Sequence, residues 1–102
     1  MAVQHLNEKN FNEARNKKGF ALVDFYADWC GPCRMLAPVI EAVAEARPDV
    51  LVAKVNVDEN PALASEFGVF SIPTVVVLKD GKQINQSVGV RPKEQLLSLL
   101  EG

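Results

Sequence analysis

Residues 20–33 read FALVDFYADWCGPC, an apolar run that leads into two cysteines. The segment from Phe20 to Ala27 is rich in strand-forming residues and is apolar at successive positions, which is typical of a strand covered on both faces. Only Asp24 places a charge in this run. We therefore expect a central strand, with Cys30 and Cys33 just beyond its carboxyl end.

An amphipathic helix is predicted directly after the cysteines, from Cys33 to Arg47. Its apolar residues recur at helical spacing, and its glutamates lie on another face; the apolar positions are Leu36, Val39, Ile40 and Val43. Pro38 removes one backbone donor inside this helix, so we expect a kink there rather than an end. The cysteine pair then lies at a helix N-terminus.

The rest of the chain predicts alternating helices and strands. Asn7 is expected to cap a short helix that ends before Gly19, and Asn60 to cap another that runs to Phe67. Asp80-Gly81 predicts a hairpin turn. The expected strands are Leu51–Val57, Thr74–Lys79 and Gln83–Val88, and a closing helix follows Pro92. The fold class is α/β, with a mixed central sheet and helices on both faces.

Length and charge narrow the function. A chain of 102 residues, 48% hydrophobic and 24% charged, fits one domain spanning residues 1–102. A net charge of -2 without a basic run gives no reason to expect nucleic acid or anionic membrane as a partner. The N-terminus does not resemble a secretory signal, and no apolar run approaches the roughly 18 residues of a membrane span. We expect a cytoplasmic monomer.

The cysteine pair predicts thiol-disulfide chemistry. In a reducing compartment, a cysteine pair is more often catalytic or metal-binding than structural. Backbone N–H groups and the dipole at a helix N-terminus lower the pKa of a thiol there, so Cys30 is expected to be the nucleophile. Pro32 suits the first helical turn, and Cys33 is expected to be the more buried sulfur. Cys30 would attack a partner disulfide, and Cys33 would then resolve the mixed disulfide.

Two other uses of the pair are open at this point. A structural disulfide closing a four-residue loop would stabilise the fold by only roughly 2 kcal/mol in the chain-entropy account. A zinc site needs four ligands, and the chain adds only His5 to the cysteines, which leaves an ion shared by two chains as the alternative. We expect no metal and no bound cofactor.

Asp24 and Lys54 are candidates for a supporting role. A carboxylate buried in the central strand would have a raised pKa through desolvation and could exchange protons with Cys33. The alternative is an exposed Asp at the end of the strand. Lys54, between Ala53 and Val55 in the next expected strand, could be its partner across the sheet. Lys54 could equally be a solvated surface lysine.

The sequence closely resembles the thioredoxins from about His5 to the C-terminus. The matching segments are residues 23–33, Pro38, residues 56–58, residues 72–74 and residues 79–81. The resemblance implies the thioredoxin fold, a cis peptide before Pro73 packed beside the cysteines, and a role as a redox carrier that reduces disulfides in client proteins. It also implies that a thioredoxin reductase returns the protein to the dithiol with electrons from NADPH.

The resemblance also implies a substrate-binding surface around Cys30. Its residues are Trp29, Gly31, Pro32, Ile72, Pro73 and Gly89. Because Pro73 has no N–H, the adjoining backbone can be left free to pair with a bound substrate strand. Gly31 and Pro32 carry no positive charge, whereas oxidising relatives have a histidine between the cysteines, so we expect a reductant.

Two positions depart from the family pattern. Tyr26 stands where many thioredoxins have tryptophan, and Phe70 stands where a polar or basic residue is common. We hypothesise that Phe70 is exposed near the docking surface and shifts partner preference towards apolar substrates. The rival functions are a partner-holding module with the same fold and a glutathione-linked oxidoreductase. Gly31, Pro32 and Trp29 argue against the latter.

Overall fold

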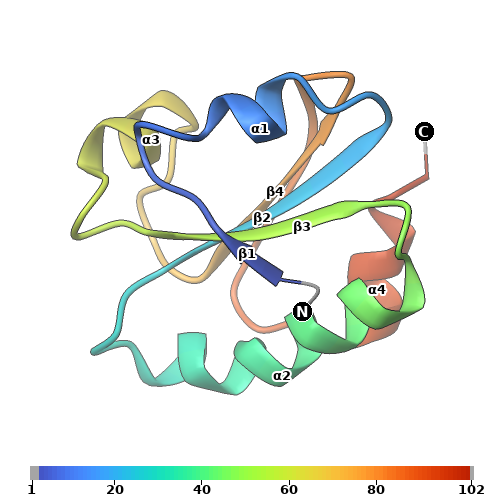
Figure 1. The fold of residues 1–102 in the computed structure, drawn as a ribbon. Coiled ribbons are helices and arrows are strands. Elements are labelled where there is room, and N and C mark those ends of the chain that lie inside the picture. Colours follow the sequence, from blue (N-terminus) through green and yellow to red (C-terminus); the bar gives the residue numbers. More distant parts are fainter. Residues whose placement is uncertain (1–2, 102) are drawn as a thin grey trace.

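In the part of the chain that the structure describes, a five-stranded sheet forms the centre of the molecule, and four helices pack on it (Figure 1). The computed structural model describes residues 3–101. The elements in chain order are β1 (Val3–His5), α1 (Asn12–Arg15), β2 (Phe20–Tyr26), α2 (Gly31–Ala46), β3 (Leu51–Asn56), α3 (Pro61–Glu66), β4 (Thr74–Lys79), β5 (Lys82–Val88) and α4 (Lys93–Ser98).

The strand order is β1-β3-β2-β4-β5, which makes β2 the central strand. β1, β3 and β2 run parallel, whereas β4 is antiparallel to β2 and β5 is antiparallel to β4. Strand β2 is paired on both edges and its five inner residues are buried, so the predicted central strand is confirmed. The fold class, a mixed sheet with helices on both faces, is confirmed as well.

The helices cover the two faces of the sheet in pairs, with α1 and α3 on one side and α2 and α4 on the other (Figure 1). Successive side chains of β2 point alternately to these faces. Val23 and Phe25 pack in the core under α1 and α3, and Leu22 packs in the core under α2 and α4. By the same alternation, Asp24 points towards the α2 side of the sheet.

The N-terminal prediction is corrected by the structure. β1 was not predicted, because a three-residue strand is too short to show an alternating pattern. Asn7 does not cap α1, whose N-cap residue is Phe11. The Asn7 side chain instead accepts hydrogen bonds from the backbone N–H groups of Lys9 and Asn10, at 2.8 and 3.0 Å, which holds a turn before the helix.

Asn60 occupies the predicted N-cap position of α3, but its side chain makes no capping hydrogen bond. Its Oδ1 accepts from the N–H of Glu8 at 3.0 Å, and its Nδ2 donates to the Asn56 carbonyl. The Glu8 carboxylate accepts from the N–H of Ala62 in the first turn of α3. Glu8, from a distant segment, therefore makes the capping hydrogen bond that Asn60 was expected to make.

The β4–β5 hairpin confirms the predicted turn. Asp80 and Gly81 both have positive φ, 51° and 83°, as a two-residue hairpin turn of type I′ requires. The turn lies against α1, because a Cβ added at Gly81 would collide with the carbonyl oxygen of Arg15. The Asp80 carboxylate accepts from the N–H of Gly19 at 2.7 Å, which ties the hairpin to the start of β2.

Candidate active site

The two cysteines lie at the carboxyl end of β2, where α2 begins. Cys30 is the N-cap residue of α2, and Cys33 lies in its first turn. The two residues form a disulfide. The Sγ of Cys30 accepts a hydrogen bond from the backbone N–H of Cys33 at 3.2 Å. The predicted position at a helix N-terminus is therefore confirmed, and a backbone N–H of the first helical turn points at the sulfur.

The two sulfurs differ in their surroundings rather than in their burial. Cys33 was expected to be the more buried residue, yet the exposed fractions are 4% for Cys30 and 3% for Cys33. Both pack with Ala27 at this end of the sheet. Cys33 lines a small cavity, whereas Cys30 lies beside an exposed apolar groove. Both residues are therefore almost fully buried, and the expected difference in burial amounts to one percentage point in favour of Cys33.

The groove beside Cys30 is lined by Trp29, Val57, Val69, Phe70, Ser71 and Ile72, and its volume is about 190 Å³. Trp29 and Phe70 are strongly exposed, at 69% and 95%. The indole Nε1 of Trp29 donates to the Asp58 carboxylate at 2.9 Å, which fixes the ring beside the cysteines. The Ile72 carbonyl oxygen lies 3.9 Å from the Cys30 Sγ. Two of its lining residues, Val57 and Ile72, also pack against the cysteines, so the groove adjoins Cys30.

The other residues of the expected binding surface have different positions. The Ile72–Pro73 peptide is cis, and Ile72 packs against the cysteines, as the resemblance implied. The Pro73 carbonyl accepts from the N–H of Gly89 at 2.8 Å, so Gly89 supports this loop without lining the groove. Gly31 and Pro32 form the start of α2 and do not line the groove either.

Asp24 is fully buried, and neither of its carboxylate oxygens has a hydrogen-bond partner among the described residues. Burial raises the pKa of this carboxyl from 3.8 to about 7, and the positive charge of Lys54 opposes the rise. The structure therefore excludes the alternative of an exposed Asp at the end of the strand. At neutral pH the carboxyl can either hold or release a proton.

Lys54 is opposite Asp24 in the β2–β3 register, as predicted. In the described part of the chain it forms no salt bridge with Asp24, and its ammonium lies over the ring of Tyr26, 4.4 Å from the centroid. Lys54, Tyr26 and Cys33 line the same cavity of about 140 Å³. Lys54 is therefore related to both groups: it is opposite Asp24 in the strand register, and it lines the same cavity as Cys33.

Sequence reasoning missed two supporting contacts. Tyr26 holds the Lys54 ammonium, and Asp58 holds the Trp29 indole. The first contact depends on the register of β2 against β3, and the second joins residues 29 positions apart. The only sequence signal for either contact was that Tyr26 departs from the family pattern.

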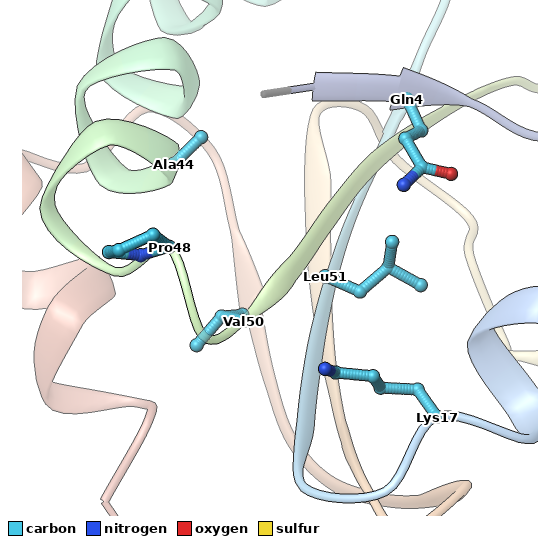
Figure 2. Close-up of a pocket in the computed structure, with 6 residues that line it drawn as sticks. All are labelled: Gln4, Lys17, Ala44, Pro48, Val50 and Leu51. Atoms are coloured by element: carbon cyan, nitrogen blue, oxygen red, sulfur yellow. The ribbon is translucent and has the colours of Figure 1, made fainter. Parts of the chain in front are cut away.

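A further hollow lies at the opposite end of the sheet (Figure 2). Its volume is about 390 Å³, and it lies between the end of α2, the start of β3 and the edge strand β1. Figure 2 shows Ala44, Pro48 and Val50 on one side and Gln4, Lys17 and Leu51 on the other. None of these six lining residues carries a sulfur or a carboxylate, so size alone does not identify the reactive site.

Residues 3–101 contain no group of three or more His, Cys, Asp or Glu side chains that could hold a metal ion. His5, the extra ligand considered from the sequence, is exposed on β1. Within the same range, no helix has the length and apolar character needed to span a membrane.

Comparisons with known proteins agree with this geometry. The Thioredoxin family model matches residues 2–102. A thioredoxin of Alicyclobacillus acidocaldarius is 53% identical over 96 residues, covering 93% of this chain and 91% of that protein. A thioredoxin of Chlamydia muridarum is 46% identical over 98 residues, covering 96% and 95%. A solved structure of a mutant thioredoxin from Halobacterium salinarum NRC-1 is 42% identical, with a TM-score of 0.89 and coverage of 96% and 87%.

The fold and the cysteine pair at the start of α2 define a thiol-disulfide oxidoreductase, a protein-disulfide reductase that carries electrons in a reversible disulfide. The sequence match extends over nearly the whole chain and includes both cysteines. The chain belongs to the thioredoxin family.

Proposed function

We propose that this chain is a cytoplasmic reductant of protein disulfides, in which Cys30 is the nucleophile and Cys33 resolves the mixed disulfide. One observation carries the assignment of roles. The Cys30 Sγ accepts the N–H of Cys33 at the N-terminus of α2 and lies beside the exposed groove. A thiolate at this position is stabilised by the helix end, and a client seated in the groove would lie next to it.

The proposed reaction has two exchange steps. The Cys30 thiolate attacks one sulfur of a client disulfide, a Cys30–client bond forms, and the second client sulfur leaves as a thiolate. The Cys33 thiolate then attacks the Cys30 Sγ, and the first client sulfur leaves. Two electrons pass from the dithiol to the client, and the protein is left with the Cys30–Cys33 disulfide seen here.

Asp24 is proposed to accept the proton that Cys33 must lose before the second step. A carboxyl with a pKa near 7 can exchange a proton with a thiol at neutral pH. Lys54 shares the cavity with Cys33 and favours the ionised form of Asp24. Its role is that of a positioning residue that adjusts the charge on Asp24.

The oxidised protein is proposed to be reduced by a thioredoxin reductase that uses NADPH, so that the chain acts as a monomeric electron carrier in cellular redox homeostasis. Its clients are proteins with accessible disulfides, and residues 1–102 act as one domain. The uncharged dipeptide Gly31-Pro32 supports the reductive direction, because no positive charge stabilises the dithiol form.

The test is insulin disulfide reduction with NADPH and a thioredoxin reductase, comparing the native chain with Cys30→Ser and Cys33→Ser. We expect no turnover in either variant, but only Cys33→Ser should accumulate a covalent adduct with insulin, visible by mass spectrometry. Ile84→Ser, on the exposed side of β5, controls for the general effects of substitution and purification, and it should reduce insulin at the native rate.

Three results would contradict the proposal. Adduct formation by Cys30→Ser would reverse the roles of the two sulfurs. Turnover that depends on glutathione but not on a thioredoxin reductase would support the glutathione-linked alternative. Absence of disulfide reduction with any electron donor would support a partner-holding module.

A further inference from the structure

Phe70 is an aromatic side chain left in water at the edge of the reactive site. Its exposed fraction is 95%, the highest of the exposed large hydrophobic residues in the described part of the chain. An isolated exposed apolar side chain needs no explanation, but this one continues the apolar wall formed by Trp29 and Ile72. A partner that enters the groove beside Cys30 would remove this ring from water.

The backbone on either side of Phe70 is held in place. The N–H of Val69 donates to the Ala64 carbonyl at 2.8 Å, and the carbonyl of Ser71 accepts from the Thr74 hydroxyl at 2.5 Å. The ring is therefore presented from a fixed loop rather than from a free end. A pre-positioned aromatic residue binds a partner with little additional ordering of the backbone.

The chemistry of the groove selects what can occupy it. None of its six lining residues is charged, and the volume of about 190 Å³ accommodates one large side chain or roughly six waters. The nearby Asp58 carboxylate is engaged by the Trp29 indole. A charged side chain entering this groove would lose hydration without gaining a partner, whereas a neutral apolar one would bury the Phe70 ring.

The position of the groove selects which part of a client enters it. Phe70 precedes Ile72 by two residues, and the Ile72 carbonyl lies 3.9 Å from the Cys30 Sγ. A client sulfur bonded to Cys30 lies roughly 2 Å from that Sγ. The residues next to the client cysteine are therefore placed beside the groove that Ile72 and Phe70 both line.

We infer that Phe70 is a specificity-determining residue that makes this protein favour client disulfides whose cysteines are flanked by a bulky apolar residue. The inference rests on the proposed reductase function and adds the substrate class. The ring need not change the chemistry of the sulfurs. It lowers the free energy of the encounter complex for apolar-flanked clients, and therefore raises kcat/KM for them.

The experiment uses the full chain, reduced beforehand, and two synthetic peptides that each contain one intramolecular disulfide. The peptides are identical except that the residues next to both cysteines are Phe in one and Ser in the other. We expect the native chain to reduce the Phe peptide about tenfold faster in kcat/KM, and Phe70→Ser to lower this ratio to about twofold. Phe70→Leu should restore most of the ratio.

The ratio of the two rates cancels any change in the reactivity of the thiols, and Ile84→Ser serves as the matched control because it removes another exposed apolar side chain, on β5. A ratio that is equal in the native chain and Phe70→Ser would overturn the inference while leaving the reductase function intact. Failure to reduce either peptide or insulin would instead contradict the reductase function. A dimer that dissociates in Phe70→Ser would assign the ring to a second copy of the chain and also overturn the inference.

Discussion

The face of the sheet under α1 and α3 differs from the face under α2 and α4, although both are packed and largely closed to water. The first is built from aliphatic and aromatic side chains such as Val23, Phe25 and Leu63. The second has a similar apolar core but also contains Asp24, a buried carboxylate whose oxygens have no hydrogen-bond partner among the described residues. Neighbouring residues of one strand, Asp24 and Phe25, therefore have opposite effects on stability.

The two faces of this small core therefore contribute differently. One mainly stabilises the fold, and the other contains a group that can transfer a proton. Burying a Phe side chain stabilises the fold by about 1.5–3 kcal/mol, whereas burying an unpaired carboxylate opposes folding whenever the group is ionised. The unfavourable group lies at the end of the sheet that carries the cysteines. We expect substitutions on the α1 and α3 face to lower stability, and substitution of Asp24 to raise stability at pH 8 and to slow proton transfer.

The largest effect is expected for Phe25→Ala. The ring is fully buried and lies 5.8 Å from the ring of Phe67, centroid to centroid. Removing it should lower the free energy of unfolding by about 4 kcal/mol, as for other buried aromatic residues. Denaturant unfolding of the oxidised protein measures the loss, and Phe70→Ala is the matched control that should lose almost nothing. A loss below about 1 kcal/mol would show that this face is not the main support.

A smaller loss is expected for Gly81→Ala, which tests how the hairpin holds α1 on its face of the sheet. The residue has a φ of 83°, and the added Cβ would collide with the Arg15 carbonyl. We expect a loss of about 2–3 kcal/mol by thermal unfolding, combining left-handed backbone strain with displacement of the α1 terminus.

Gly68→Ala separates the two contributions. Gly68 also has a positive φ, 67°, but nothing lies within 4 Å of an added Cβ. Its substitution should therefore cost only the strain, about 1–2 kcal/mol. Equal losses at the two glycines would contradict the proposed contact between the hairpin and α1.

A gain in stability is expected for Asp24→Asn at pH 8. The pKa of Asp24 in the folded state, about 7, lies above its ordinary value of 3.8. The folded protein therefore binds more protons between these values, and its stability falls as the pH rises from about 4 to 7. The pKa shift corresponds to a destabilisation of roughly 4 kcal/mol by the ionised carboxylate. An unpaired buried amide at this position would itself cost about 1–3 kcal/mol, so the net gain from the substitution is about 2 kcal/mol.

The pH dependence provides the control for this variant. At pH 3, Asp24 is neutral in both states, so Asp24→Asn should be no more stable than the native chain. A gain of equal size at pH 3 and pH 8 would show that desolvation of the charge is not its cause. The same variant should release reduced insulin more slowly near pH 7, since Cys33 loses its proton acceptor.

The smallest effect is expected for Lys54→Met, which keeps the length of the side chain and removes its charge. Lys54 lowers the pKa of Asp24, so its removal should move the fall in stability to higher pH. NMR of the Asp24 carboxyl carbon measures the midpoint of its titration directly. Lys93→Met, exposed on α4, should leave the midpoint in place. A shift to lower pH in Lys54→Met would contradict the assigned electrostatic role.

Much of the site could be predicted because its signals are local in sequence. The strand before Cys30, the amphipathic helix after Cys33 and the Asp80-Gly81 turn each depend on neighbouring residues, and all three are present. The missed features depend on distant partners. β1 exists because its three residues pair with β3, and the end of α3 is satisfied by Glu8 rather than by Asn60.

The sequence by itself determined the cysteine pair, its place between a strand and a helix, and the mixed sheet, because strand and helix periodicity are encoded in consecutive residues. Only the tertiary structure decided that Asp24 is fully buried without a hydrogen-bond partner among the described residues, that the Lys54 ammonium lies over Tyr26, and that Phe70 extends the groove beside Cys30. Burial and electrostatic interactions depend on strand register and on the packing of segments far apart in the chain, so short-range patterns do not specify them.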